Sequence, residues 1–157
     1  MTDQHDFMQE AIALSALNIK EKCWGPFGAV IVKDGQIVGR GYNHVVANND
    51  PTAHAESMAI RDACKNLWTF DLQDCEIYTS CEPCPMCLGA IYRARIENIY
   101  FANTEQDAHD IGFDDEIFYD EFSKPAAQRK VHSVQIDHAA ARAVFDQRKQ
   151  TVNDIKY

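Results

Sequence analysis

The sequence predicts a three-layer αβα domain with a central five-stranded sheet. Helix-like and strand-like segments alternate along most of the chain, as they do where helices cover both faces of one sheet. The length of 157 residues matches one domain and allows one sizeable core. No internal repeat, low-complexity tract or Gly/Ser-rich linker interrupts the chain, so we expect residues 1–157 to form a single domain.

A helix and a hairpin are predicted first. Apolar side chains recur at helical spacing over residues 6–22, and a Gly-Pro pair at 25–26 ends that pattern. Two apolar runs, 27–32 and 37–42, flank an Asp-Gly pair at 34–35, which is typical of a tight hairpin turn. The two runs are therefore predicted to be neighbouring strands.

The middle of the chain alternates between helix and strand. The Ala-rich segment 53–66 has a helical pattern and precedes a β-prone run at 76–79. A second helix is predicted at 85–93, followed by a strand at 96–101. These segments bring the expected number of strands to four.

The C-terminal part begins with a polar, acidic segment at 103–125, which predicts short helices. Residues 131–136 are predicted to be the fifth strand and residues 138–150 a closing helix. Residues 151–157 have no such pattern.

The composition is that of an acidic globular protein. Apolar residues make up 46% of the chain, and 15 Lys and Arg face 24 Asp and Glu, for a net charge of −9. Non-specific binding to a polynucleotide depends on clustered cations, so this balance disfavours a nucleic-acid partner. A local basic groove that includes Arg93, Arg95 and residues 128–130 stays open as an alternative.

The sequence carries no recognisable targeting or membrane signal. Its acidic N-terminus lacks the basic start and apolar run of a signal peptide. It also has no apolar stretch of the about 18 residues that a transmembrane helix needs. We therefore expect a cytoplasmic protein without a membrane partner, whose six cysteines stay reduced.

Three residues at two predicted helix starts form a candidate metal site. His54 begins one helix, and Cys84 and Cys87 form a Cys-x-x-Cys step at the start of the next. Unpaired backbone N–H groups at a helix start favour thiolates, and two thiolates with one imidazole are typical zinc ligands. A catalytic zinc keeps three protein ligands and one open position, whereas a structural zinc is closed by four.

Glu56 is the candidate proton carrier of this site. Two thiolates cancel the formal charge of Zn²⁺, so the metal acidifies its water less than a zinc held by three neutral imidazoles would. Glu56 lies two residues from His54, where it can reach a bound water without being a ligand and act as general base and acid.

Other interpretations of the cysteines stay open. Cys81 could complete a closed tetrahedron in a non-catalytic, zinc-stabilised binding module, although we expect it at the exit of the preceding strand. The Cys-x-x-Cys pair taken alone could be a redox pair. Cys23, Cys64 and Cys75 are expected to be small core residues.

Four sequence blocks carry a resemblance to a known family. The combination His-x-Glu and Pro-Cys-x-x-Cys matches the signature of zinc-dependent base deaminases. The chain resembles the cytidine deaminase-like superfamily, and within it the small bacterial guanine deaminases, over nearly its whole length. The blocks that carry the resemblance are residues 25–32, 49–56, 78–92 and 112–115, together with a Lys-Tyr ending.

The resemblance implies a cytidine deaminase-like fold with a mixed sheet and the hydrolytic deamination of guanine to xanthine and ammonia. It also implies one Zn²⁺ per subunit and a homodimer in which C-terminal segments of about residues 138–157 are exchanged. Asp115 would contact the purine and act as a second proton shuttle. The implied substrate-binding residues are Phe27, Asn43, Ala55, Asp115 and Tyr157.

The sequence blocks specify the deamination reaction more narrowly than the substrate. Guanosine, tRNA adenosine, a cytosine derivative and an aminotriazine remain alternative substrates. Arg93 departs from the family pattern, which often has tryptophan there, and it could either stack on a purine or be a solvated helix residue.

Overall fold

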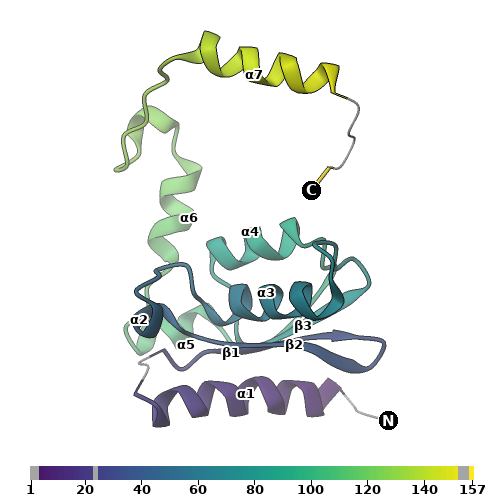
Figure 1. The fold of residues 1–157 in the computed structure, drawn as a ribbon. Helices are drawn as coiled ribbons and strands as arrows, with labels where there is room; N and C mark the ends of the chain where they lie inside the picture. The colour runs from purple at the N-terminus through teal and green to yellow at the C-terminus, as the bar shows by residue number, and fades with distance from the viewer. Residues whose placement is uncertain (1–3, 23–24, 152–155) are drawn as a thin grey trace. The chain divides into compact units, whose positions relative to one another are not determined.

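The computed structural model describes residues 4–22, 25–151 and 156–157. The chain divides into two compact units, Met1–Asp115 and Glu116–Tyr157. The first unit contains a complete sheet with its covering helices (Figure 1).

The sheet has four strands in the order β2-β1-β3-β4. β1 (Gly28–Lys33) and β2 (Gln36–Tyr42) form the predicted antiparallel hairpin, and β1 also pairs antiparallel with β3 (Cys75–Cys81). β3 pairs in parallel with β4 (Asn98–Asn103), and the helix between them provides the crossover connection that a parallel pair needs. The sheet is therefore mixed, as expected.

Alternating side chains of β1 separate two apolar layers. Ala29 and Ile31 face one cluster, which includes α3 (Ala55–Leu67) and α4 (Pro85–Arg93). Val30 and Val32 face a second cluster, which includes Phe7 of α1 (Gln4–Lys20). Figure 1 accordingly shows α1 on one face of the sheet and α3 and α4 on the other. This arrangement confirms the three-layer αβα prediction.

A close approach between β2 and α3 brings the start of that helix onto the sheet. A Cβ atom on Gly41 would lie 2.2 Å from the carbonyl oxygen of Ala55 and 2.3 Å from the backbone nitrogen of Ala59. Only a residue without a side chain allows the helix to pack so close to the strand. The first turn of α3 is held in this way.

Two short helices complete the first unit. α2 (Val45–Asn48) was not expected from the sequence, whereas α5 (Glu105–Asp110) lies in the segment predicted to hold short helices. Thr104 caps α5 through a capping box with Asp107.

The second unit contains α6 (Glu116–Ser123), a 3₁₀ turn (Ala126–Gln128) and α7 (His138–Gln150). The closing helix has the predicted bounds. None of the described residues from 116 to 157 is buried.

The predicted fifth strand is wrong. Residues 131–136 form no strand, and Val131 and Val134 are 81% and 82% exposed. An apolar alternation indicates a strand only where a sheet edge pairs with its backbone, and these residues have no such pairing in the described structure. The sheet therefore has four strands instead of five.

Two remaining expectations concern the cysteines and the membrane. Cys75 is buried, and Cys64 packs against the same core, as predicted for small apolar residues. Cys23 lies outside the described residues. In the described part of the chain, every helix is too short or too polar to cross a bilayer.

Candidate metal and catalytic site

His54 is held by the loop that leads into α3. The carboxylate of Asp50 accepts hydrogen bonds from the backbone N–H of Thr52 at 2.8 Å and from its hydroxyl at 2.7 Å. The backbone N–H of His54 then donates to the carbonyl of Thr52 at 2.9 Å. His54 precedes the first residue of α3 in an extended conformation, so the turn around Asp50 determines where its ring lies.

Cys84 and Cys87 are held by the start of α4. Cys84 is the N-cap of that helix, and its sulfur accepts from the backbone N–H of Cys87 at 3.5 Å. Pro85 occupies the first turn, where its missing N–H is not needed. The helix start therefore places both sulfurs on one side, as the Cys-x-x-Cys spacing predicts.

The three candidate ligands come together. The ligand atoms of His54, Cys84 and Cys87 lie within 4.8 Å of one another, and Cys84 Sγ is 3.6 Å from His54 Nδ1. In tetrahedral zinc coordination, ligand atoms are about 3.5 Å apart. The donor set and its spacing therefore fit zinc, and His54, Cys84 and Cys87 form a zinc-binding triad.

Cys81 does not join this triad. It is the last residue of β3, as expected for the strand exit, and its thiol donates to the carbonyl of Thr104 at 3.6 Å. Burial raises the pKa of Cys81 to about 12, which keeps it a thiol. Among the described residues the metal group has three members, which agrees with a site that keeps an open position.

The polar contacts of Cys84 favour its thiolate. The pKa of Cys84 is lowered to about 4, chiefly because the Cys87 thiol donates to its sulfur, with a further hydrogen bond from His54. The same contact and its burial raise the pKa of Cys87, so the pair holds one proton between the two sulfurs. The hydrogen bond to Cys84 also raises the pKa of His54. A bound cation favours both thiolates and releases the remaining protons.

Glu56 lies in the first turn of α3 and is buried. Burial raises the pKa of its carboxyl to about 7. A carboxyl with such a pKa can both accept and donate a proton near neutral pH.

A cavity of about 300 Å³ has two members of the triad, His54 and Cys84, in its wall. This volume is at the small end of ligand pockets and suits one nucleobase. The cavity is lined by Gly25, Phe27, Asn43, Val45, Val46, Pro51, His54, Glu56, Cys81, Glu82, Cys84, Ala108, Phe113 and Asp115. Metal ligands, the buried carboxyl of Glu56 and mostly apolar walls therefore meet in one space.

Three of the predicted substrate-binding residues line this cavity. Phe27 contacts Phe113 edge to face, with ring centroids 4.9 Å apart. Asn43 is buried, and its Oδ1 accepts from the backbone N–H of Val45 at 3.1 Å. The carboxyl of Asp115 is half-buried, and burial raises its pKa, with a further contribution from the charge of Cys84.

The other two predicted substrate-binding residues lie elsewhere. Ala55 is fully buried in the core cluster and is not among the residues that line the cavity. Tyr157 belongs to the second unit, where its side chain is 83% exposed. The roles of both stay predictions.

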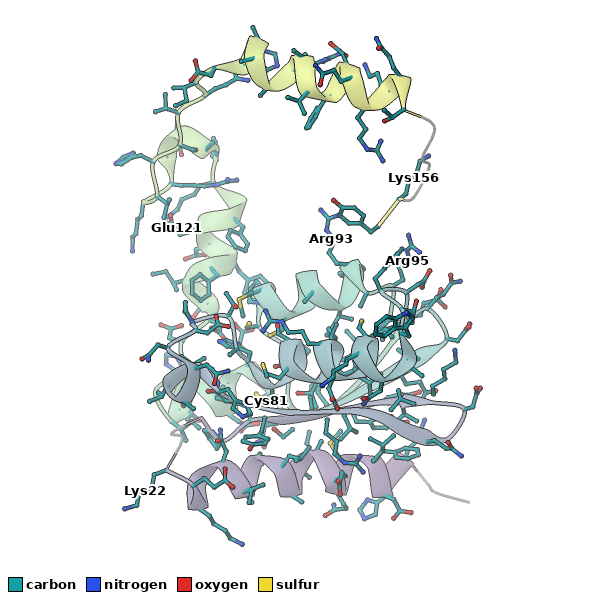
Figure 2. The ribbon with its side chains drawn as sticks, viewed as in Figure 1. Lys22, Cys81, Arg93, Arg95, Glu121 and Lys156 are labelled. Carbon is teal, nitrogen blue, oxygen red and sulfur yellow. The ribbon has the colours of Figure 1, made fainter. Side chains whose placement is uncertain are left out.

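Several lining residues were not identified from the sequence. Phe113 lies two residues before Asp115, and an aromatic residue beside a candidate catalytic carboxyl is the signal that could have identified it. Val45 and Val46 belong to the unexpected helix α2. Arg93, by contrast, is exposed, and its side chain points away from the sheet (Figure 2).

The chain matches a family model and several known proteins. Residues 1–103 match the model of the cytidine and deoxycytidylate deaminase zinc-binding region. The chain is 46% identical to a guanine deaminase of Bacillus subtilis over 151 residues, which cover 96% of this chain and 97% of the relative. It is 48% identical to a tRNA-specific adenosine deaminase of Aquifex aeolicus over 82 residues, which cover 52% of this chain and 54% of the relative.

Solved structures agree with these matches. The crystal structure of the Bacillus subtilis guanine deaminase superposes with a TM-score of 0.94 at 45% identity, covering 99% of both chains. A structure solved with bound 8-azaguanine superposes with a TM-score of 0.67 at 35% identity, covering 70% of this chain and 64% of that chain. The zinc-binding triad, the three-layer fold and these likenesses agree, and the chain belongs to the cytidine and deoxycytidylate deaminase family.

Proposed function

We propose that this protein is a zinc-dependent guanine deaminase, which hydrolyses guanine to xanthine and ammonia. The observation that carries the proposal is a nucleobase-sized cavity lined by two members of the metal triad, His54 and Cys84, and by the carboxyl groups of Glu56 and Asp115. The likeness to the Bacillus subtilis guanine deaminase, which extends over 96% of this chain, supports guanine as the substrate.

The metal and the chain have separate tasks in this reaction. His54, Cys84 and Cys87 would hold the zinc, which would supply a polarised water for attack on a ring carbon. Glu56 would accept a proton from the attacking water and donate it to the ring nitrogen beside C2, the carbon that carries the amine. Its burial next to the triad excludes bulk water from this transfer.

Asp115 assists at the exocyclic amine, which must leave with a further proton. Its carboxyl lines the same cavity as Glu56 but is only half-buried. Two carboxyl groups in different environments can divide the acid and base roles. Phe27 and Asn43 hold the base between an aromatic ring and an amide.

Ammonia release from guanine by the zinc-loaded chain tests the proposal. Glu56→Gln should keep one zinc per chain and lose nearly all turnover, because the amide cannot carry the proton. Glu10→Gln is the matched control, since Glu10 pairs with Arg40 on the exposed surface and its loss should leave turnover unchanged. Robust turnover by the Glu56 variant would overturn the assignment of Glu56.

Deamination of adenosine in tRNA is the second candidate function. The 48% identity to a tRNA-specific adenosine deaminase favours it, although only 52% of this chain is matched. The net charge of −9 opposes binding to a polyanion. Guanine, guanosine, a tRNA anticodon stem-loop, cytidine and an aminotriazine, assayed side by side for ammonia, separate these substrates. Turnover of another substrate without turnover of guanine would reject guanine and leave the chemistry intact.

We further propose a homodimer in which segments of about residues 138–157 are exchanged, so that Tyr157 closes the partner's cavity. Two observations support the proposal. None of the described residues from 116 to 157 is buried, and a unit of this size rarely folds alone. The exposed apolar side chains of this unit are Ile117, Phe118, Tyr119, Phe122, Val131, Val134, Ile136, Val144, Phe145 and Tyr157. A set of this size supports the proposal that another chain covers this surface.

Complementation between two defective chains tests the exchange. The Glu56→Gln chain keeps Tyr157, and the Tyr157→Ala chain keeps Glu56. If the tails are exchanged, one cavity of each heterodimer regains both residues, and the refolded mixture should recover about a quarter of the wild-type turnover. Without exchange every cavity keeps a defect, so a mixture no more active than its two components would reject the proposal. Light scattering checks that the chain is a dimer.

A further inference from the structure

A buried asparagine on α1 links two segments of the cavity wall. The side chain of Asn18 is fully buried, and its Nδ2 donates to the backbone carbonyl of Gly25 and, at 3.0 Å, to that of Asn43. Gly25 and Asn43 both line the cavity, while Asn18 does not. Because a carbonyl oxygen only accepts, Asn18 must present its NH₂ group to both partners.

Gly25 and Asn43 are also packed directly against each other. A Cβ atom on Gly25 would lie 2.6 Å from Cγ and 2.9 Å from Nδ2 of Asn43. The N–H of Asn43 donates to the carbonyl of Phe27 at 3.2 Å, and the N–H of Phe27 donates to the carbonyl of Gly25 at 2.8 Å. The amide of Asn43 therefore rests on a backbone that Asn18 holds at two points.

The Asn43 side chain has a defined orientation. Its Oδ1 accepts from the backbone N–H of Val45 at 3.1 Å, so the opposite side of the amide carries the two N–H donors. Among the described residues, none provides an acceptor for Nδ2 in the observed hydrogen bonds. Asn43 thus offers the cavity a donor, which pairs with an acceptor atom of a purine.

We propose that Asn18 is a positioning residue for substrate binding. It holds the carbonyls of Gly25 and Asn43 so that the Asn43 amide keeps its donor directed at the base. The inference rests on the proposed function, because it assumes that a purine binds beside Asn43.

The placement of Asn18 separates this role from that of the metal. Asn18 lies on α1, which covers one face of the sheet, whereas α3 and α4 cover the other face (Figure 1). The metal ligands lie at the N-terminal ends of α3 and α4. None of the described hydrogen bonds of Asn18 reaches His54, Cys84 or Cys87. Loss of its donors should therefore weaken binding of the base and leave zinc binding intact.

Asn18→Asp is the direct test, because aspartate has the same shape but offers the two carbonyls at most one donor, and that only when it is protonated. We expect the KM for guanine to rise about tenfold, the effect of one lost hydrogen bond to the base. kcat should stay within about threefold, and the zinc content should equal that of the wild type. The Kd of zinc-loaded protein for the analogue 8-azaguanine, measured by calorimetry, should rise by the same factor as the KM.

Gly25→Ala is the second variant, and it decides the matter if Asn18→Asp does not fold. Its added Cβ would displace the Asn43 amide without changing Asn18, so the KM and the Kd should again rise together. Asn66→Asp is the matched control, since Asn66 Nδ2 donates to the carbonyl of Val38 at 2.9 Å on the exposed surface. Leu72→Ala serves as a destabilised core control, because Leu72 is buried away from the cavity.

The outcomes are distinct. Unchanged KM and Kd in both Asn18→Asp and Gly25→Ala would overturn the inference. The inference would also be overturned if kcat and zinc content fell together in Asn18→Asp and Leu72→Ala reproduced this fall. That result would indicate that Asn18 has only a structural role. If the wild type does not deaminate guanine but binds 8-azaguanine, the proposed function fails and the Kd values still decide the role of Asn18. If it does neither, both proposals fail.

Discussion

The contact between β2 and α3 predicts opposite effects for two glycine-to-alanine substitutions. In Gly41→Ala the new Cβ would lie 2.2 Å from the carbonyl oxygen of Ala55 and 2.3 Å from the nitrogen of Ala59, both backbone atoms of α3. In Gly89→Ala, on the exposed side of α4, the new Cβ has no neighbour within 4 Å. The first variant must move a helix, and the second only gains helix propensity.

The magnitudes follow from the same contacts. Overpacking costs about 1–3 kcal/mol, and a clash with two backbone atoms belongs at the upper end. The smaller entropy of the unfolded alanine chain offsets about 0.7 kcal/mol, so Gly41→Ala should lose about 2 kcal/mol net, or about 4–8 °C in Tm. Gly89→Ala should gain about 0.8–1 kcal/mol, or about 2–4 °C.

The assay is thermal unfolding of both variants at one protein concentration and one zinc load, together with zinc titration. Gly41→Ala should also bind zinc more weakly, because a shifted first turn of α3 moves His54. Gly89→Ala should bind zinc like the wild type. A Tm for Gly41→Ala within about 1 °C of the wild type would refute the idea that this glycine sets the position of α3.

Further predictions concern the cavity and the metal. Cys81→Ser should retain one zinc per chain by metal analysis, whereas Cys84→Ser should lose it; loss of zinc from both would indicate a closed four-ligand site. Phe113→Ala removes an aromatic contact with Phe27 worth about 0.5–1.5 kcal/mol. Steady-state kinetics should therefore show a KM for guanine about two- to tenfold higher. An unchanged KM would mean that the Phe113 ring does not contact the bound base. Asp115→Asn should lower kcat about 10²–10⁴-fold with zinc retained, and near-normal kcat would exclude its role in proton transfer. A chelator should lower the Tm of the wild type, and excess zinc should restore it, because zinc is expected to bind the folded state and not the unfolded chain. A Tm that the chelator leaves unchanged would contradict this expectation.

Local patterns explain which parts of the fold could be predicted. The hairpin depends on its Asp-Gly turn, in which Asp34 and Gly35 both have positive φ, and the helix at 85–93 depends on a proline at its start. Both signals act within a few residues, so the sequence alone contains them. The segment 131–136 has an equally clear alternation, but no sheet edge within residues 4–22, 25–151 and 156–157 pairs with it, and pairing is not a local property.

The candidate site divides in the same way. His54, Cys84 and Cys87 could be predicted because each lies at a helix start and zinc accepts few ligand sets. Asn18 could not, because its role depends on segments that only folding brings together. Asn18 lies seven residues from Gly25 and 25 residues from Asn43 along the chain, and no spacing rule connects them.

Two parts of the cavity wall are held in place by different kinds of structure. This difference suggests how substrate preference can change within the family while the metal ligands stay in place. The triad and Glu56 lie at the starts of α3 and α4, which pack on the central core. Two thiolates would reduce the acidifying power of a bound zinc, so the proposed role of Glu56 predicts that Glu56 and the triad must be kept together. Another part of the cavity wall, with Asn43 and Phe113, is held by hydrogen bonds and ring contacts in loops. Loops can change without moving the metal ligands, which agrees with the matches of this chain both to a guanine deaminase and to a tRNA-specific adenosine deaminase. A substrate exchange engineered into this chain should therefore begin with the segments around Gly25, Asn43 and Phe113.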